Sequence, residues 1–199
     1  MCGRYYVDDG TAREIEKVVR KVEAGLLFQK AGDVYPSQAA PVLTGRSGEL
    51  TVELMNWGFP RYQSKGLLIN ARAETVLERK TFRESVLHRR CIIPAGHFYE
   101  WDAQKEKVQF QREDDPVLYM AGFYNRFQDM DRFMIITTQA NASVAPVHER
   151  MPLVLEQSEL EAWVYDDAFL SFALTKEPAQ LRPYREFEQQ SLFSRYLHL

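Results

Sequence analysis

Four polar residues occupy positions where a purely structural explanation would expect apolar side chains. Cys2 directly follows the initiator methionine, and Asn70 follows the apolar run LLI at 67–69. Glu100 ends the segment CIIPAGHFYE, and His148 ends the segment ANASVAPVH. Each lies where an apolar stretch ends, which is where loops and strand ends carry functional side chains.

An N-terminal cysteine can do chemistry that an internal cysteine cannot. Removal of Met1 would leave Cys2 with a free α-amine, of pKa about 7.7–8.0, beside a thiol of pKa about 8.5. An aldehyde can form a Schiff base with that amine, and the thiol can then close on the imine carbon to give a five-membered thiazolidine. Because ring closure is intramolecular, positioning supplies much of the rate. Cys2 therefore indicates a site that captures an aldehyde.

The other three residues suit helper roles in such a reaction. The carboxyl group of Glu100 can act as general acid or base when the carbinolamine loses water. The imidazole of His148 can move a proton near neutral pH, and the amide of Asn70 can hold the amine by hydrogen bonding. Each also has an ordinary structural explanation: a small buried cysteine, a turn or cap asparagine, a solvated strand end and a half-buried histidine.

The patterning along the chain predicts one α+β domain that is richer in strand than in helix. Helices are expected at 11–22 and 81–89, each with a capping-box spacing, and at 158–164. Strands are expected at 5–7, within 34–45 and its partner 50–59, at 91–101 with a break at Pro94 and Gly96, and at 131–141. The segments 108–113 and 117–127 flank the turn DDP and are predicted to form a hairpin.

The composition excludes several classes of protein. The 199 residues are 45% hydrophobic, 27% charged and 13% aromatic, as in a soluble globular protein. No apolar run reaches the roughly 18 residues of a membrane helix, and the first residues lack the apolar core of a secretory signal. Two cysteines and four scattered histidines indicate a cytoplasmic protein with no disulfide framework, no metal and no cofactor. The net charge of −3 argues against bulk coating of duplex DNA but leaves a local basic groove open.

Five motifs, in this order, resemble the SOS-response-associated peptidase (SRAP) family: MCGRY, NAR followed by AET, CIIPAGHFYEW, ITTQAN and HERMP. The resemblance runs from residue 2 to roughly residue 165 and implies a single domain over 1–199, a mostly antiparallel, barrel-like twisted sheet with a few short flanking helices. Family members crosslink to abasic sites in single-stranded DNA. The resemblance therefore implies that Cys2 captures the sugar aldehyde and that Asn70 orients its amine. It also implies that Glu100 is the acid/base near the deoxyribose and that His148 assists ring opening and crosslink reversal.

The resemblance also implies contacts with DNA. Arg4, Arg72 and Arg150 match positions near phosphates, which the guanidinium group suits, and Pro36, Ser37 and Thr138 match a loop and a strand beside the site. Trp57 matches an aromatic residue that stacks on bases, although a core tryptophan is the alternative. The loop after Trp57 is compressed and keeps one tryptophan, which leaves the details of stacking open. One face is expected to gather Arg4, Arg61, Lys65, Arg72, Arg89, Arg90 and Arg150.

The sequence thus favours a cytoplasmic, monomeric protein, nucleoid-associated when bound to DNA, that binds abasic single-stranded DNA and links to it through a Cys2 thiazolidine. Such a link would shield the lesion from strand cleavage, and its Schiff-base intermediate could β-eliminate as a side activity. Two alternatives remain. One is a thiol peptidase in which Cys2 attacks a peptide carbonyl with His148 as base, an activity that could be limited to removing a short leader from its own N-terminus. The other is a single-strand binder without catalysis.

Overall fold

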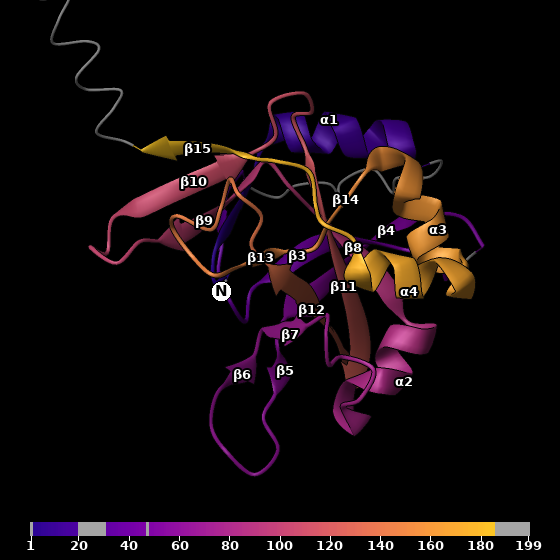
Figure 1. The fold of residues 1–199 in the computed structure, drawn as a ribbon. Coiled ribbons are helices and arrows are strands. Elements are labelled where there is room, and N and C mark those ends of the chain that lie inside the picture. The colour runs from indigo at the N-terminus through magenta and orange to yellow at the C-terminus, as the bar shows by residue number, and fades with distance from the viewer. Residues whose placement is uncertain (1, 20–30, 47, 186–199) are drawn as a thin grey trace, which may run out of the picture.

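The structure is a computed structural model and describes residues 2–19, 31–46 and 48–185, in which strands predominate over four short helices (Figure 1). In chain order the elements are β1 (Tyr5–Val7), α1 (Asp9–Val18), β2 (Gly32–Val34), β3 (Ala39–Thr44), β4 (Thr51–Trp57), β5 (Phe59–Pro60), β6 (Leu67–Leu68), β7 (Asn70–Arg72), α2 (Lys80–His88), β8 (Arg90–Ala95), β9 (His97–Trp101), β10 (Lys107–Gln111), β11 (Leu118–Phe127), β12 (Met130–Gln139), β13 (Arg150–Pro152), β14 (Val154–Leu155), a 3₁₀ turn (Gln157–Glu159), α3 (Leu160–Tyr165), α4 (Asp167–Thr175) and β15 (Arg182–Arg185).

The larger sheet closes on itself. Its strands follow the order β12–β4–β3–β8–β11, and β11 pairs again with β12, so five strands form a barrel-like ring. The β12–β4 pairing is parallel and the others in the ring are antiparallel. Farther along, β12 pairs with β7 and β13, and in this way β12 brings the segments that carry Asn70 and His148 toward one end of the ring. The fold class expected from the sequence is confirmed.

The smaller sheet is antiparallel, with the order β15–β10–β9–β1–β2. Strand alternation gives it two different faces. Tyr5, Phe98 and Val108 point inward and are buried. Glu100 stands opposite Val108 in the β9–β10 register, so this carboxyl group also lies on the inner face. The outer face carries polar and aromatic side chains instead.

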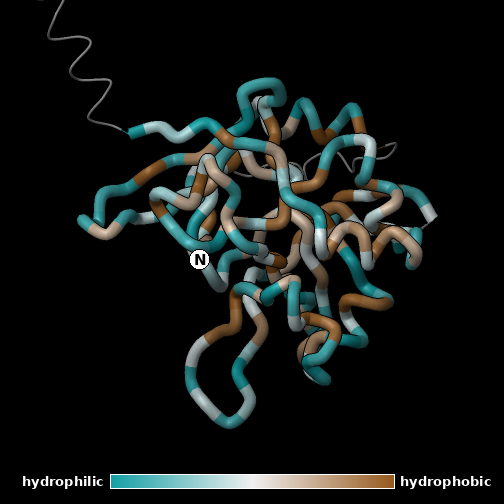
Figure 2. The backbone as a smooth tube through the Cα atoms, viewed as in Figure 1, coloured by the Kyte–Doolittle hydropathy of each residue, from teal (hydrophilic) through white to brown (hydrophobic). Residues whose placement is uncertain are grey.

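The apolar residues gather in two clusters on the two sides of the barrel strands. One cluster contains Cys2, Tyr5 and Trp57, and the other is covered by helices α1, α3 and α4. In Figure 2 the apolar stretches lie mainly on the central strands and the polar stretches on the outer loops. Gly122 marks a close approach within the barrel, because a Cβ atom there would lie 2.4 Å from Ile93 Cδ1.

The predicted hairpin between 108–113 and 117–127 is wrong. Strand β10 pairs with β9 and β15, whereas β11 pairs with β8, β12 and β14, so the turn carries the chain from one sheet to the other. The burial patterns give the physical reason. β10 alternates between buried and half-buried residues, as a one-sided sheet requires, while the first seven residues of β11 are all buried. A strand covered on both faces belongs in the interior of the closed sheet.

The helices differ from the prediction mainly at their ends. Helix α1 begins at Asp9, because Asp8 and not a later residue is the cap: Asp8 Oδ1 accepts a hydrogen bond from the Thr11 backbone at 2.8 Å. The predicted end at residue 22 lies outside the described residues. Helix α2 has no side-chain cap, so the predicted capping box does not form there. The sequence interpretation did not identify α4.

Candidate active site

Cys2 lies at the entrance to β1 with its side chain fully buried. Its thiol contacts the backbone carbonyl of Arg4 at 3.8 Å. Asn70 Nδ2 donates a hydrogen bond to the Cys2 carbonyl oxygen at 2.8 Å, and the pairing of β7 with β12 fixes Asn70 in that position. The structure thus brings together two residues that are 68 positions apart in sequence.

Trp57 supports this arrangement from inside the core. Its side chain is completely buried, its ring stacks on Phe133 with centroids 6.2 Å apart, and its Nε1 donates to the carbonyl of Ile69 at 3.0 Å. A ring without exposed surface offers no face to a base, so the prediction that Trp57 stacks on DNA is wrong. The indole instead holds the residue directly before Asn70.

Glu100 is buried on the inner face of β9, with 2% of its surface exposed. Burial raises the pKa of Glu100, and the nearby imidazole of His148 acts in the opposite direction. Burial also raises the pKa of the Cys2 thiol, and the negative charge of Glu100 raises it further. These charge effects link Cys2 to Glu100 and Glu100 to His148.

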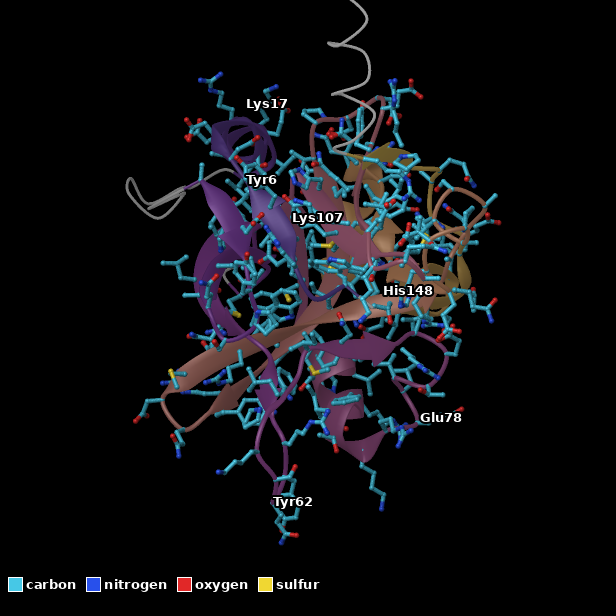
Figure 3. The ribbon with its side chains drawn as sticks, turned by 90° about the vertical axis from the view of Figure 1, so that its left-hand side faces the viewer. Tyr6, Lys17, Tyr62, Glu78, Lys107 and His148 are labelled. Atoms are coloured by element: carbon cyan, nitrogen blue, oxygen red, sulfur yellow. The ribbon has the colours of Figure 1, made fainter. Side chains whose placement is uncertain are left out.

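His148 sits at the end of the loop between β12 and β13. Its Nδ1 accepts a hydrogen bond from the backbone N–H of Arg150 at 2.9 Å. The same Nδ1 also lies 3.2 Å from the carbonyl oxygen of Arg150, so both backbone groups of Arg150 hold this side of the ring. Figure 3 labels His148 on the side of the molecule that also carries Lys107 and Tyr6.

Asn141 organises the His148 loop, and the sequence interpretation did not single it out. Its Nδ2 donates to the carbonyl oxygens of Pro178 and Ala179 at 3.0 and 2.9 Å, and its Oδ1 accepts from Ser143 Oγ at 2.6 Å. The side chain is 5% exposed. A polar residue closing the strand-like run ITTQAN was the available signal, since buried amides usually hold loops by such hydrogen bonds.

Arg150 does not present its guanidinium group to solvent. Its side chain is 8% exposed and makes a bidentate pair with Glu74 at 2.6 and 2.9 Å, and Nη2 also donates to Thr137 O at 2.7 Å. The predicted phosphate contact is therefore contradicted. Arg150 instead ties the segment after β7 to β12, and so joins the segments of Asn70 and His148.

The other predicted DNA-contacting residues lie near the surface. Arg72 is exposed, two residues beyond Asn70. Pro36 and Ser37 form the turn before β3, where Ser37 is exposed and has a φ of 77°. Thr138 is half-buried and lines a cavity of about 830 Å³ together with Asn141 and helix α4.

Arg4 is half-buried in an aromatic setting beside Cys2. It pairs with Asp33, and its guanidinium carbon lies 5.1 Å from the Tyr35 ring centroid and 4.7 Å from that of Tyr99. Burial raises the pKa of Asp33, but the hydrogen bond and charge of Arg4 outweigh it and lower the pKa overall. Arg4 is thus held rigidly between two rings.

The expected basic face is only partly present. Arg90 is 5% exposed and binds Asp167 at 2.8 Å and backbone carbonyls, so it is structural like Arg150. Arg61 and Lys65 are exposed in the loop between β5 and β6, which extends away from the body in Figure 1. At its tip Tyr62 is 87% exposed and points outward in Figure 3, a feature that the sequence interpretation missed.

Within residues 2–19, 31–46 and 48–185, no three His, Cys, Asp or Glu side chains form a group that could hold a metal ion. In the same part of the chain, no helix has the length and apolar character needed to span a membrane.

A family model described as SOS response associated peptidase (SRAP) matches residues 1–191. The chain belongs to the SRAP family. The motifs that carry the site therefore lie within a match that covers nearly the whole sequence.

The names of curated relatives agree with the family, and a solved structure shares the fold. Abasic site processing protein YoaM of Bacillus subtilis is 28% identical over 183 residues, covering 82% of this chain and 79% of that protein. Abasic site processing protein YedK of Escherichia coli is 26% identical over 176 residues, covering 82% and 79%. A crystal structure of a Bacteroides thetaiotaomicron protein superposes with a TM-score of 0.79 at 24% identity, covering 92% of this chain and 91% of that one, and supports the fold.

Proposed function

We propose that this protein processes abasic sites in single-stranded DNA by forming a thiazolidine crosslink through Cys2 once Met1 has been removed. The observation that supports the proposal best is the position of Cys2 in the fold. A residue one position from the chain start is buried in a site with Glu100 and His148, and its carbonyl is held by Asn70. The names of the family relatives point to the same lesion.

The reaction balances with the release of one water molecule. The α-amine of Cys2 adds to the aldehyde carbon of the opened sugar and gives a carbinolamine. A proton is delivered to the hydroxyl group, which leaves as water and produces an imine. The thiol sulfur then adds to the imine carbon, and the thiol proton ends on the ring nitrogen. No oxidant or reductant is needed, and β-elimination from the imine would give a lyase side activity.

The environments of Glu100 and His148 fit the two proton transfers. Because burial raises the pKa of Glu100, this carboxyl group keeps its proton closer to neutral pH and can donate it to the leaving hydroxyl. His148, whose charge acts on Glu100, can exchange protons with the sugar oxygen during ring opening and crosslink reversal.

Asn70 offers an acceptor for the amine that Met1 removal would liberate. Its Nδ2 already binds the Cys2 carbonyl, while its Oδ1 is buried and accepts no hydrogen bond from the described residues. A buried amide oxygen without a donor is unfavourable. An N–H of the Cys2 amine would satisfy it and hold the nucleophile in place.

Exposed basic and aromatic side chains near the site would bind the strand. Arg72 lies two residues beyond Asn70 on β7 and would contact a phosphate. The exposed Tyr62, flanked by Arg61 and Lys65, would supply the stacking surface that buried Trp57 cannot.

The peptidase alternative receives less support from the site. A cysteine peptidase attacks with a thiolate, which requires a lowered thiol pKa. Burial and the charge of Glu100 both raise the pKa of Cys2. In the crosslinking reaction the amine reacts first, and the neutral thiol adds only after the imine has formed. A raised thiol pKa therefore suits crosslinking better than peptide cleavage.

The proposal is tested by incubating Met1-processed protein with an oligonucleotide that contains one abasic site. We expect a heat-stable adduct on a denaturing gel, with an intact mass one water below the sum of its parts. Cys2→Ala should form none, whereas Cys91→Ala, which removes the other buried cysteine, should form it normally. An undiminished adduct with Cys2→Ala would refute the proposal, and retention of DNA without any adduct in the wild type would favour a non-catalytic binder.

A further inference from the structure

The outer face of the smaller sheet carries several aromatic side chains. Strand registers place the following residues on this side, which we call the aromatic face: Tyr6, His97, Tyr99, Trp101, Lys107, Gln109 and Tyr184. Within it, Tyr6 stacks on His97 with centroids 4.6 Å apart and planes 10° apart. The left-hand side of Figure 1 faces the viewer in Figure 3, where Tyr6 and Lys107 are labelled near each other.

The rings at the edge of this face have surface to offer a ligand. Trp101 is 39% exposed and Tyr184 is 37% exposed. By contrast, Trp57 and Trp163 are completely buried. Large exposed aromatic side chains that gather on one sheet face often mark an interaction surface.

Cations lie over two rings of the aromatic face, and the Arg182 guanidinium carbon lies 5.2 Å from the Tyr184 ring centroid. Lys107 Nζ lies 5.2 Å from the Tyr99 ring centroid, and His97 Nε2 lies 2.7 Å from Tyr99 Oη. Burial lowers the pKa of His97 to about 4, so its ring is neutral near pH 7. A neutral ring stacks without adding charge, and the lysine adds one cation beside it.

Three carboxylates near the face are each held by an arginine, and a fourth, Asp8, which acts on His97, caps helix α1. Asp33 pairs with Arg4, and Arg185 binds Asp102 at 2.7 Å and Glu106 at 3.1 Å. A polyanion lying on the face would therefore meet no uncompensated acidic side chain among these three. An occupant would be retained mainly by stacking and only weakly by net charge.

The aromatic face is continuous with the candidate active site. Strand β9 places Glu100 on the inner face between Tyr99 and Trp101, which point outward. Just before β1, Arg4 lies between Cys2 and Tyr6 in sequence, and its guanidinium group packs on the Tyr99 ring. A chain that leaves the site past Arg4 would reach the aromatic face next.

We infer that the aromatic face binds the single-stranded DNA arm beside the lesion, with bases stacked on Trp101 and Tyr184. This inference rests on the proposed function. Every base has a ring face, so stacking on exposed aromatic residues is tolerant of sequence, as binding to a lesion in any context requires. The face would thus make affinity depend on the length of the single-stranded arm.

The test compares two abasic oligonucleotides whose arms are about 4 and about 16 nucleotides long, a span that covers single-strand binding sites of one fold. The variant is Trp101→Ala with Tyr184→Ala, and the control is Phe172→Ala, an exposed aromatic residue on α4. We expect the protein concentration for half-maximal adduct to rise about tenfold with long arms, within the range for loss of stacked bases. With short arms, and for the control with either substrate, it should stay unchanged.

An equal loss with short and long arms, or no loss at all, would overturn the inference. Failure of the wild type to form any adduct would refute the proposed function instead, and the face can still be tested on undamaged strands. Trp101 is the exposed member of three tryptophans, so a long undamaged strand should quench its emission and shield it from acrylamide. Trp101→Phe should abolish that signal and keep the long-arm affinity, and quenching that persists would contradict the assignment.

Discussion

Replacing Glu74 by alanine should destabilise the protein more than the exposure of Glu74 suggests. Its side chain is 41% exposed, and substitutions at such positions usually change stability by less than about 0.5 kcal/mol. Here the substitution would leave the guanidinium group of Arg150, which is 8% exposed, without its carboxylate. Removing one partner of a buried ion pair costs about 3–5 kcal/mol. We expect about 2–3 kcal/mol, because water reaches the Glu74 side and Thr137 O still accepts from Arg150.

Urea denaturation at pH 7 measures this loss as the change in the free energy of unfolding. The double variant Glu74→Ala with Arg150→Met should recover part of the stability, because it removes the buried guanidinium charge that Glu74→Ala leaves unpaired. Glu74→Gln should lose less stability than Glu74→Ala. A loss of less than about 0.5 kcal/mol for Glu74→Ala would refute the structural role assigned to Arg150.

The same pair predicts a pH dependence. The hydrogen bond from Arg150 lowers the pKa of Glu74 below its ordinary 4.5 in the folded protein. Its contribution to stability is therefore complete above 4.5 and is lost as the pH falls through the folded value. The difference in stability between wild type and Glu74→Gln should shrink in acid. A difference in stability that grew as the pH fell would contradict the lowered pKa of Glu74 in the folded protein.

Three further predictions concern other residues. Arg72→Gln should weaken binding to abasic DNA and reduce the salt slope by about one, without lowering stability, as measured by titration at several salt concentrations. Glu100→Gln should slow adduct formation about 100-fold and remove the decline in rate as the pH rises through the raised pKa of Glu100, which a pH–rate profile checks. Gly122→Ala should cost about 3 kcal/mol in thermal or urea unfolding, since its Cβ would lie 2.5 Å from Met134 O.

The sequence predicts the elements of this fold better than their pairing. Alternation and apolar runs identify most strands. The predicted break at Gly96 separates β8 from β9, whereas the predicted break at Pro94 is wrong, since Pro94 lies within β8. The pairing of β10 with β15 could not be read from neighbouring residues, because it joins segments more than seventy positions apart. The closure of β11 on β12 and β12 on β4 likewise depends on contacts that no local pattern encodes.

For the site as well, the sequence predicts which residues matter better than it predicts where their side chains point. Cys2, Asn70, Glu100 and His148 could be singled out because polar side chains end apolar runs, and in the structure Asn70 binds Cys2. Whether Trp57 and Arg150 face DNA or the core could not be decided from residue type, since burial depends on the packing of distant strands. Tyr62 and Asn141 were overlooked because exposure and loop hydrogen bonds appear only in three dimensions.

Peptide mapping of the adduct bears most closely on the proposed chemistry. The Met1-processed protein is incubated with an abasic oligonucleotide, digested with protease and nuclease, and analysed by tandem mass spectrometry. We expect the sugar remnant on the N-terminal peptide, with both the amine and the sulfur of Cys2 blocked to alkylation. A remnant on a lysine elsewhere, or a Cys2 whose thiol still alkylates within the adduct, would contradict a thiazolidine at this position.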